Sequence, residues 1–309
     1  MPTNVTEFKD ETAYERYVLE HTASFVPKVD GRSIIELGDG GTVSANIQAP
    51  PARVTALATD GTQSYDGSDG VDLQVIRAMV FGAAWKVIDL LVELSLNQGP
   101  AAKQRYSIDF KAKEATAGSV SPLPPFVVLP DIWDRVMASY VATIALRHSL
   151  VHRRLDVDQT TGLITATSDP KDPPVSPMTS DEQVAFGRVA DGVAQAVIAG
   201  QLAPRQENSV KWLLDQLAAH HGKQLFGVSA KEGLIPEVII RPTVGVMNNV
   251  TIDFDSVRRR AHDAVGGLAY YDLRIHLPNG GILSAPLEDA PSGRLTFSVD
   301  QLPGWLQRT

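Results

Sequence analysis

The sequence predicts an α+β protein in which a central α-helical bundle is flanked by β-rich N- and C-terminal segments. Three observations predict this class. Residues 33–47 alternate around a Gly-rich turn, residues 73–96 carry apolar side chains at helical spacing, and the pattern from residue 223 onward is mainly that of strands. The predicted segments are 1–65 (a helix and a β-hairpin segment), 66–222 (the helical domain) and 223–309 (the C-terminal β-rich domain).

The first segment begins with a predicted helix over residues 7–21. The sequence between Ser33 and Ile47 then predicts a hairpin, because polar and apolar residues alternate on both sides of Gly40-Gly41. Residues 54–58 can add a strand. Residues 60–70 are rich in Gly, Ser, Thr and Asp, which predicts a loop or a boundary.

The helical segment opens with the longest helix expected in the chain, residues 73–96, which ends at Asn97-Gln-Gly-Pro100. Spacings of three and four place one set of its apolar residues on a single stripe. Lys86, Asp89 and Glu93 share another face, which we expect to be a solvated charged face. The apolar stripe consists of Leu73, Ile76, Val80, Ala83, Val87, Leu90 and Leu94.

Residues 101–130 contain four prolines and predict irregular structure, and a second strong helix is expected over 131–151. A small hairpin over 155–167 should turn at Thr161-Gly162. Thr179 and Glu182 form a capping-box pattern, in which each side chain bonds the backbone N–H of the other residue at a helix start. The helix that follows should end at Gly200, and the next should cover 204–222. Within the C-terminal segment, a short helix is expected around 256–265.

Two distant segments of the chain resemble each other. Residues 35–45 (IELGDGGTVSA) and 275–285 (IHLPNGGILSA) share six of eleven positions without a gap. Two unrelated hairpins can converge on the same turn residues. Alternatively, two related β units, one at each end of the chain, flank or jointly enclose the helical centre.

Composition excludes several classes of function. The 309 residues include no cysteine, which rules out disulfide scaffolds, Cys-based zinc sites, iron–sulfur clusters and a cysteine nucleophile. A formal charge of −8 argues against a surface that coats nucleic acid, although a local basic site remains open. The acidic N-terminus lacks the pattern of a signal peptide, and no apolar run reaches about 20 residues. We therefore expect a cytoplasmic protein with no membrane partner.

One short motif carries chemistry. The second strong helix closes with Arg147-His148-Ser-Leu-Val-His152, followed by Arg153 and Arg154. This run resembles the signature of the HEPN superfamily: an Arg, a polar residue, further positions that include apolar ones, and a His. The long helix over 73–96 fits the partner helix of such a domain. Arg16 and His21 have the same spacing but lie in a short acidic segment without that setting.

The resemblance implies a dimerising helical bundle with Arg147 and His152 at the end of a core helix. Many members of the superfamily are metal-independent ribonucleases, which would make this chain an endoribonuclease without a cofactor, such as a toxin or a defence effector. Other members bind RNA or nucleotides without cleaving them. The superfamily's frequent tyrosine two positions after the His is replaced here by Arg154.

The residue types suit RNA cleavage. RNA carries its own nucleophile, the 2′-hydroxyl, which DNA lacks. His152 can accept the hydroxyl proton when neutral, or protonate the leaving 5′-oxygen when charged. Arg147 can hold the phosphate and stabilise its developing charge. With His148, Arg153 and Arg154 as substrate-binding residues, this stretch is the densest basic patch of an acidic chain.

Simpler roles stay open for these residues. Arg147 and His152 can stabilise a helix C-terminus through its dipole. His148 and His152, four residues apart, share a helix face that could bind zinc, but no third ligand is apparent nearby. Asp89 or Glu93 could serve as the acidic residue that some superfamily members use, besides forming a solvated face. We expect exposed polar surface at His220-His221 and at residues 258–262, the latter with an RNA contact as an alternative.

Two functions of different class follow. The first is a homodimeric, metal-independent endoribonuclease that cleaves single-stranded RNA. The second is a binding or assembly protein that keeps a HEPN-like core without turnover and recognises protein partners through its β-rich ends. On an unbroken helix, Arg147 and His152 would lie about 140° apart, so one cleft can hold both only if the helix ends between them or a second subunit completes the site.

Overall fold

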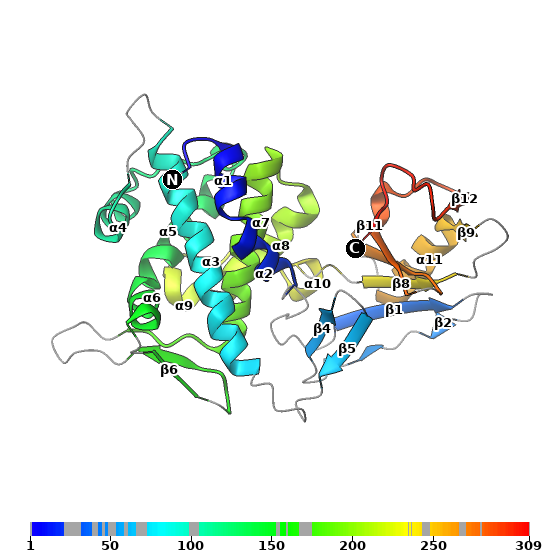
Figure 1. The fold of residues 1–309 in the computed structure, drawn as a ribbon, viewed down its shortest axis with the longest axis horizontal. Coiled ribbons are helices and arrows are strands. Elements are labelled where there is room, and N and C mark those ends of the chain that lie inside the picture. Colours follow the sequence, from blue (N-terminus) through cyan, green and yellow to red (C-terminus); the bar gives the residue numbers. More distant parts are fainter. Residues whose placement is uncertain are drawn as a thin grey trace. The chain divides into compact units, whose positions relative to one another are not determined.

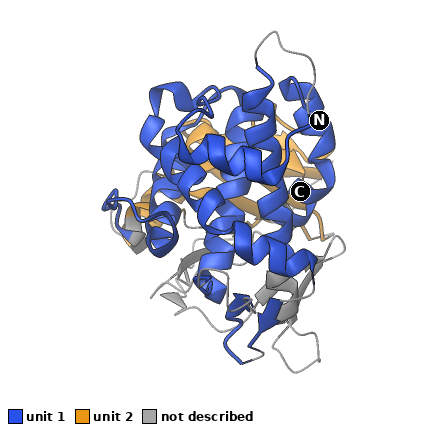
Figure 2. Cartoon of the chain, turned by 90° about the vertical axis from the view of Figure 1, so that its left-hand side faces the viewer, with its two compact units in different colours: residues 1–28, 53–57, 63–229 blue, residues 29–52, 58–62, 230–309 orange. Residues whose placement is uncertain are grey.

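The computed structural model divides the chain into two compact units (Figure 2). Unit 1 comprises residues 1–28, 53–57 and 63–229, and unit 2 comprises 29–52, 58–62 and 230–309. The chain is therefore α+β, with helices concentrated in unit 1 and a sheet in unit 2. The structure describes residues 2–21, 32–38, 43–44, 47–48, 54–58, 61–65, 73–98, 105–152, 155–158, 160–166, 175–233, 235, 237–242, 248–265, 270–278 and 280–308.

Helix α3 (Leu73–Leu96) is the central element of unit 1 and has the predicted bounds. It packs along α7 (Ser180–Ala199) (Figure 1). The rings of Phe81 and Phe186 lie 5.4 Å apart in this contact. Described residues on several sides of α3 are buried, so the helix has no single apolar stripe facing one neighbour. The buried members are Val80, Phe81, Ala84, Trp85, Val87, Ile88, Leu90, Leu91, Val92 and Leu94.

Two predicted helices are each interrupted at a buried threonine. The first consists of α1 (Val5–Glu11) and α2 (Ala13–His21), and the second of α5 (Pro130–Ala142) and α6 (Ile144–Val151). The Thr12 hydroxyl donates to the carbonyl of Phe8, and the Thr143 hydroxyl lies within hydrogen-bond distance of the carbonyls of Ser139 and Tyr140. Such bonds to the preceding turn compete with the helical ladder and bend it. The prediction of one continuous helix was wrong in both places.

Two further expectations are corrected. The stretch predicted to be irregular contains α4 (Ile108–Thr116) and the short 3-10 helix η1 (Phe126–Val128). The Ser107 hydroxyl starts α4 by accepting a hydrogen bond from the backbone of Phe110. Strand β4 (Val54–Ala58) forms as expected, but it pairs with β5 (Gly61–Tyr65) inside the segment predicted to be a loop.

The rest of unit 1 follows the predicted order. Strands β6 (Leu155–Val157) and β7 (Ile164–Ala166) form the small hairpin, and Gly162 adopts a φ of 69° at its turn. The Thr179–Glu182 capping box is present at the start of α7. Helices α8 (Pro204–Gln216) and α9 (Ala218–His221) replace the single helix predicted over 204–222.

Unit 2 contains a seven-stranded sheet. Strand β8 (Glu237–Arg241) lies at its centre and pairs in parallel with β1 (Arg32–Gly38) on one side and β10 (Asp272–His276) on the other. The first β-rich segment of the sequence therefore contributes strands to the same sheet as the last. The remaining strands are β2 (Val43–Ser44) and β3 (Ile47–Gln48), which both pair with β1, and β11 (Ile282–Pro286) and β13 (Gln307–Arg308) beyond β10.

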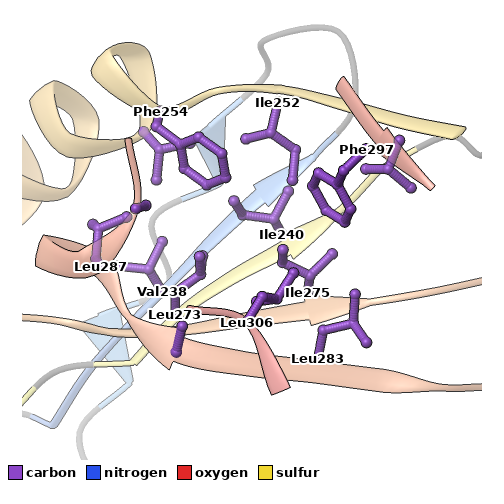
Figure 3. Close-up of a cluster of buried hydrophobic side chains, with 14 of the residues drawn as sticks. Val238, Ile240, Ile252, Phe254, Leu273, Ile275, Leu283, Leu287, Phe297 and Leu306 are labelled. Atoms are coloured by element: carbon purple, nitrogen blue, oxygen red, sulfur yellow. The ribbon is translucent and has the colours of Figure 1, made fainter. Parts of the chain in front are cut away.

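The core of unit 2 lies on one face of this sheet (Figure 3). Alternate residues of β8 and β10, among them Val238, Ile240, Leu273 and Ile275, point into it. The core is completed by residues of helix α11 (Phe254–Val265), strands β9 (Asn249–Asp253) and β12 (Arg294–Ser298), and the short 3-10 helix η3 (Leu287–Asp289). A short helix, α10 (Ala230–Gly233), precedes β8.

The two similar segments occupy comparable places in the sheet. Each begins with a strand that pairs in parallel with β8, and each strand is followed by an antiparallel partner. The registers differ, however. Val238 of β8 lies opposite Ile35 on one side, whereas on the other it lies opposite Leu273 rather than Ile275, the residue equivalent to Ile35. The similarity therefore corresponds to two strand pairs of one sheet, offset by two residues.

None of the described helices combines the length and the apolar character that crossing a bilayer would require.

Candidate functional site

The motif residues lie at the end of α6. Arg147 and His148 are half-buried on this helix, and His152 is its exposed C-terminal cap, with a backbone N–H that donates to the carbonyl of His148. The helix thus ends at His152 and not between the two predicted catalytic residues. Arg153 and Arg154, predicted to bind substrate, lie outside the described residues.

Close packing between α3 and α6 brings the motif against the centre of unit 1. A Cβ added at Gly82 would lie 2.9 Å from a methyl carbon of Leu150, inside the normal contact distance. Glycine at this position therefore allows α6 to approach α3 closely. Trp85, one turn further along α3, is buried beside Arg147 as a result.

Arg147 is held by an aromatic ring. Its guanidinium carbon lies 5.1 Å from the centre of the Trp85 ring, a distance at which a cation is attracted by the negative face of the π-system. Within the described part of the chain, no atom accepts a hydrogen bond from the Arg147 guanidinium. The guanidinium nitrogens are not buried, because buried nitrogens without a partner do not include those of Arg147. They are therefore accessible to solvent. The N–H donors of this half-buried arginine are therefore available to a bound ligand.

Other arginines of the chain use these donors on the protein itself. Arg16, which has the same spacing to a histidine, donates to the Thr12 hydroxyl and to the carbonyl of Lys9. Arg135 donates twice to the carbonyl of Gln224 and once to that of Asp131. The structure therefore separates the two Arg-x4-His sequences: Arg16 fastens a helix junction, whereas Arg147 does not.

A second ring lies next to Trp85. Tyr140 of α5 stacks on it with ring centres 4.9 Å apart, and its hydroxyl donates to Asp89 Oδ1 over 2.8 Å. Burial, and then the negative charge of Asp89, raise the pKa of Tyr140 well above its usual value. The hydroxyl therefore stays protonated and remains a donor to Asp89 at neutral pH and well above it.

The expectation of a solvated face at Asp89 and Glu93 was wrong. Lys111 of α4, whose side chain is 4% exposed, lies 2.6 Å from Asp89 and 3.9 Å from Glu93. Glu93 also accepts a hydrogen bond from the backbone of Tyr106. Lys86 alone is exposed, and it pairs with Glu15. Buried charges need partners of this kind because the low-dielectric interior otherwise disfavours the charged form.

Arg147 and His152 make no direct contact with each other in the described structure. The rings of His148 and His152 lie 6.4 Å apart, but in the described residues no hydrogen bond or ring contact joins either of them to Arg147. Arg147 faces Trp85, while the exposed His152 ends the helix. A phosphate that binds both residues would have to lie between them.

Trp85, Tyr140 and Lys111 were missed in the sequence. Trp85, Asp89 and Glu93 follow one another at spacings of four, which places them on one stripe of α3. An aromatic residue in line with two carboxylates on an otherwise apolar helix is the signal that could have indicated a buried polar cluster. Lys111 gave no such signal, because the surrounding segment was predicted to lack a helix.

The expectation of exposed surface at His220 and His221 was also wrong, since both are buried. His220 Nε2 lies 3.3 Å from Glu182 Oε1. His221 accepts a hydrogen bond from the backbone of Lys223 at Nδ1, so its proton is on Nε2, which donates to the carbonyl of Leu214. Burial lowers the pKa of His221. These side chains fasten the end of α9 to α7 and α8.

Arg258 likewise differs from the expected exposed residue. Its guanidinium donates to the carbonyls of Leu287, Ala290 and Pro291 and contacts Asp255. The neighbouring Arg259 and His262 are exposed as predicted. Arg258 thus joins α11 to the segment after β11, and its donors are occupied by the protein.

In the described part of the chain, no three His, Asp or Glu side chains are grouped as they would be around a metal ion. The polar cluster around Asp89 contains two carboxylates and a lysine, and His148 and His152 have no third ligand beside them.

The chain matches no family model, no curated protein and no solved structure.

Proposed function

We propose that unit 1 is a HEPN-like helical domain that acts as a homodimeric, metal-independent endoribonuclease on single-stranded RNA. The single observation that carries the proposal is the state of Arg147. Its guanidinium rests on Trp85 with no acceptor among the described residues, five positions before the exposed His152. A cation with unused, solvent-accessible donors at the basic end of a helix is suited to bind a phosphate.

In the proposed reaction, the 2′-hydroxyl oxygen attacks the adjacent phosphorus and the bond to the 5′-oxygen breaks. Neutral His152 accepts the hydroxyl proton while water protonates the leaving 5′-oxygen; alternatively, charged His152 protonates that oxygen while water takes up the hydroxyl proton. Arg147 binds the phosphate oxygens and stabilises the charge that develops on them. The products are a 2′,3′-cyclic phosphate and a 5′-hydroxyl. His148, Arg153 and Arg154 contribute positive charge that holds the RNA backbone.

The dimer is part of the proposal because the resemblance to the HEPN superfamily implies one, and because Arg147 and His152 make no direct contact within one chain. A second copy that contacts the end of α6 would place its own motif opposite the first. Val151, which directly precedes His152, is 54% exposed, so an apolar contact is available beside the site. The acidic remainder of the chain would direct RNA to this basic end.

The experiment is a cleavage assay on a single-stranded RNA in EDTA with purified wild type, Arg147→Ala and His152→Ala, alongside the mass of each protein in solution. The proposal predicts a dimeric wild type that cleaves, and variants that remain dimeric and lose at least about a hundredfold in rate, the usual contribution of a general acid or base. Arg16→Ala is the matched control, because Arg16 has the same spacing to a histidine. Full activity in both motif variants would refute the proposal.

The contact between Arg147 and Trp85 is also compatible with a second function. A guanidinium fixed on Trp85 and a histidine that caps a helix are also what a purely structural motif requires. In that case the protein is a HEPN-like binding or assembly module without turnover, which recognises protein partners through the strands of unit 2. A wild type that neither binds nor cleaves RNA, with motif variants that lose only stability, would support this second function.

A further inference from the structure

Trp85 has no role in the reaction described above, yet it is the residue that holds Arg147. The geometry points to Trp85 as a positioning residue that presents the Arg147 guanidinium to the phosphate, with Tyr140 stacked on the indole. This inference rests on the proposed function. The two contacts that carry it are the 5.1 Å approach of Arg147 to the indole and the 4.9 Å stack of the indole on Tyr140.

The contact with the indole uses the charge of the Arg147 guanidinium and not its N–H donors. Attraction to an aromatic face acts on the charge of the cation as a whole and requires no particular N–H group. The donors of an arginine lie in the plane of the guanidinium and form a rigid fork that matches two phosphate oxygens. An indole partner therefore holds the side chain and leaves the fork unoccupied. A carboxylate in the same place would occupy the fork.

The indole of Trp85 is itself fixed in position. Trp85 is buried, and its ring N–H has no acceptor among the described residues, so packing holds the ring. The packing partner Tyr140 is fully buried, and its hydroxyl is fixed by Asp89. Asp89 in turn bonds Lys111 over 2.6 Å. Arg147 thus contacts an aromatic pair whose tyrosine is fixed by the ion pair of Asp89 and Lys111.

A guanidinium that is already fixed lowers the free-energy cost of binding the phosphate. An unpaired arginine at a helix surface samples many rotamers, and ordering it when substrate binds costs free energy. A guanidinium already held in place pays less of that cost, and the benefit persists in the transition state, where the phosphate charge is largest. Loss of the indole should therefore lower kcat as well as raise KM.

The activity test compares Trp85→Leu with Trp85→Phe. Because a phenyl ring keeps a π-face, Trp85→Phe should stay within about threefold of the wild-type kcat/KM, whereas Trp85→Leu should lose roughly ten- to a hundredfold, mostly in kcat. Trp212→Leu is the control, since Trp212 is also buried, in α8 of the same unit, and in the described residues no hydrogen bond or ring contact joins it to either motif residue. Equal losses in Trp85→Leu and Trp212→Leu would reduce Trp85 to a structural residue and overturn the inference.

A second measurement needs no cleavage. In protein labelled with 15N-arginine, the Arg147 Nε–H signal, assigned with Arg147→Lys, should be displaced by the ring current of Trp85. It should move again when a non-cleavable 2′-O-methyl RNA is added. A signal at the position of a free arginine would overturn the inference even if RNA is cleaved. A displaced signal in a protein that shows no RNA cleavage, and does not respond to the RNA, would refute the proposed function while showing that Trp85 holds Arg147.

Discussion

The hydroxyl of Tyr140 donates a hydrogen bond to Asp89, which at its other oxygen accepts one from Lys111. These residues come from α5, α3 and α4, so one carboxylate joins three helices of unit 1. The arrangement supports Trp85 and, through it, Arg147. The stability of the helical unit and the geometry of the candidate site therefore depend on the same few side chains.

Lys111 is the first target for a stability measurement. Replacement of Lys111 by Met leaves the buried Glu93 and the partly buried Asp89 without their cation, and removal of one partner from a buried pair costs about 3–5 kcal/mol. We expect a loss of this size in denaturant unfolding. Asp89→Asn combined with Lys111→Met should recover part of it. The control is Lys211→Met, which removes a more exposed pair with Glu207 and should cost at most about 1 kcal/mol. Equal losses for the two lysines would contradict the account.

The pH dependence of stability should contain a contribution from Glu182. Burial raises the pKa of its carboxyl, but the nearby imidazole of His220 and the hydrogen bonds from Thr179 outweigh burial and lower the pKa overall. A carboxyl whose pKa is depressed in the folded state stabilises the protein above its unfolded pKa of about 4.3, and this stability is lost as the pH falls through the folded value.

We therefore expect wild type to lose more stability than Glu182→Gln when the pH is lowered from about 6 to about 3, in chemical unfolding at each pH. Thr179→Ala should lose about 1 kcal/mol at neutral pH, the usual cost of an N-cap, and should show a smaller acid dependence than wild type. Identical acid dependence in wild type and Glu182→Gln would show that the capping box does not depend on that charge.

Arg258 provides a test that separates structure from RNA binding in unit 2. Arg258→Met removes the donors from three backbone carbonyls and should destabilise unit 2 by about 2–3 kcal/mol. Arg259→Met, at the exposed neighbouring position, should stay within about 0.5 kcal/mol of wild type. Hydrogen exchange of the strands of unit 2 reports both effects. Weaker RNA binding by Arg258→Met without faster exchange would assign that arginine to RNA contact instead.

Several elements could be predicted because their signals are local. Residues 73–96 form a helix with the predicted bounds, and the hairpin after the motif and the Thr179–Glu182 capping box also form as predicted. In each case the pattern of side chains over a few turns is enough, since helix spacing, turn residues and caps act between near neighbours in the sequence. The α+β class follows from the same patterns.

The remaining features depend on contacts between distant residues. The breaks at Thr12 and Thr143 follow from hydroxyl groups buried by other helices, which then bond their own backbone. Asp89 and Glu93 are shielded from solvent because they pair with Lys111, which lies 22 positions after Asp89. Lys111 belongs to a helix, α4, that was not predicted because of the prolines in the stretch 101–130. The contact between Arg147 and Trp85 requires α6 to lie on α3. Sequence spacing indicated Arg147 but not what holds it.

Cleavage by the 2′-hydroxyl, with Arg147 and His152 as the catalytic residues, can be tested in a single assay. A pool of single-stranded RNA of random sequence is incubated in EDTA with wild type, Arg147→Ala or His152→Ala, next to the same pool in 2′-O-methyl form. We expect wild type to cleave only the unmodified RNA and to leave 2′,3′-cyclic phosphate ends, and we expect both variants to lose this activity. Cleavage of the 2′-O-methyl pool, undiminished cleavage by either variant, or intact RNA with wild type would contradict this prediction.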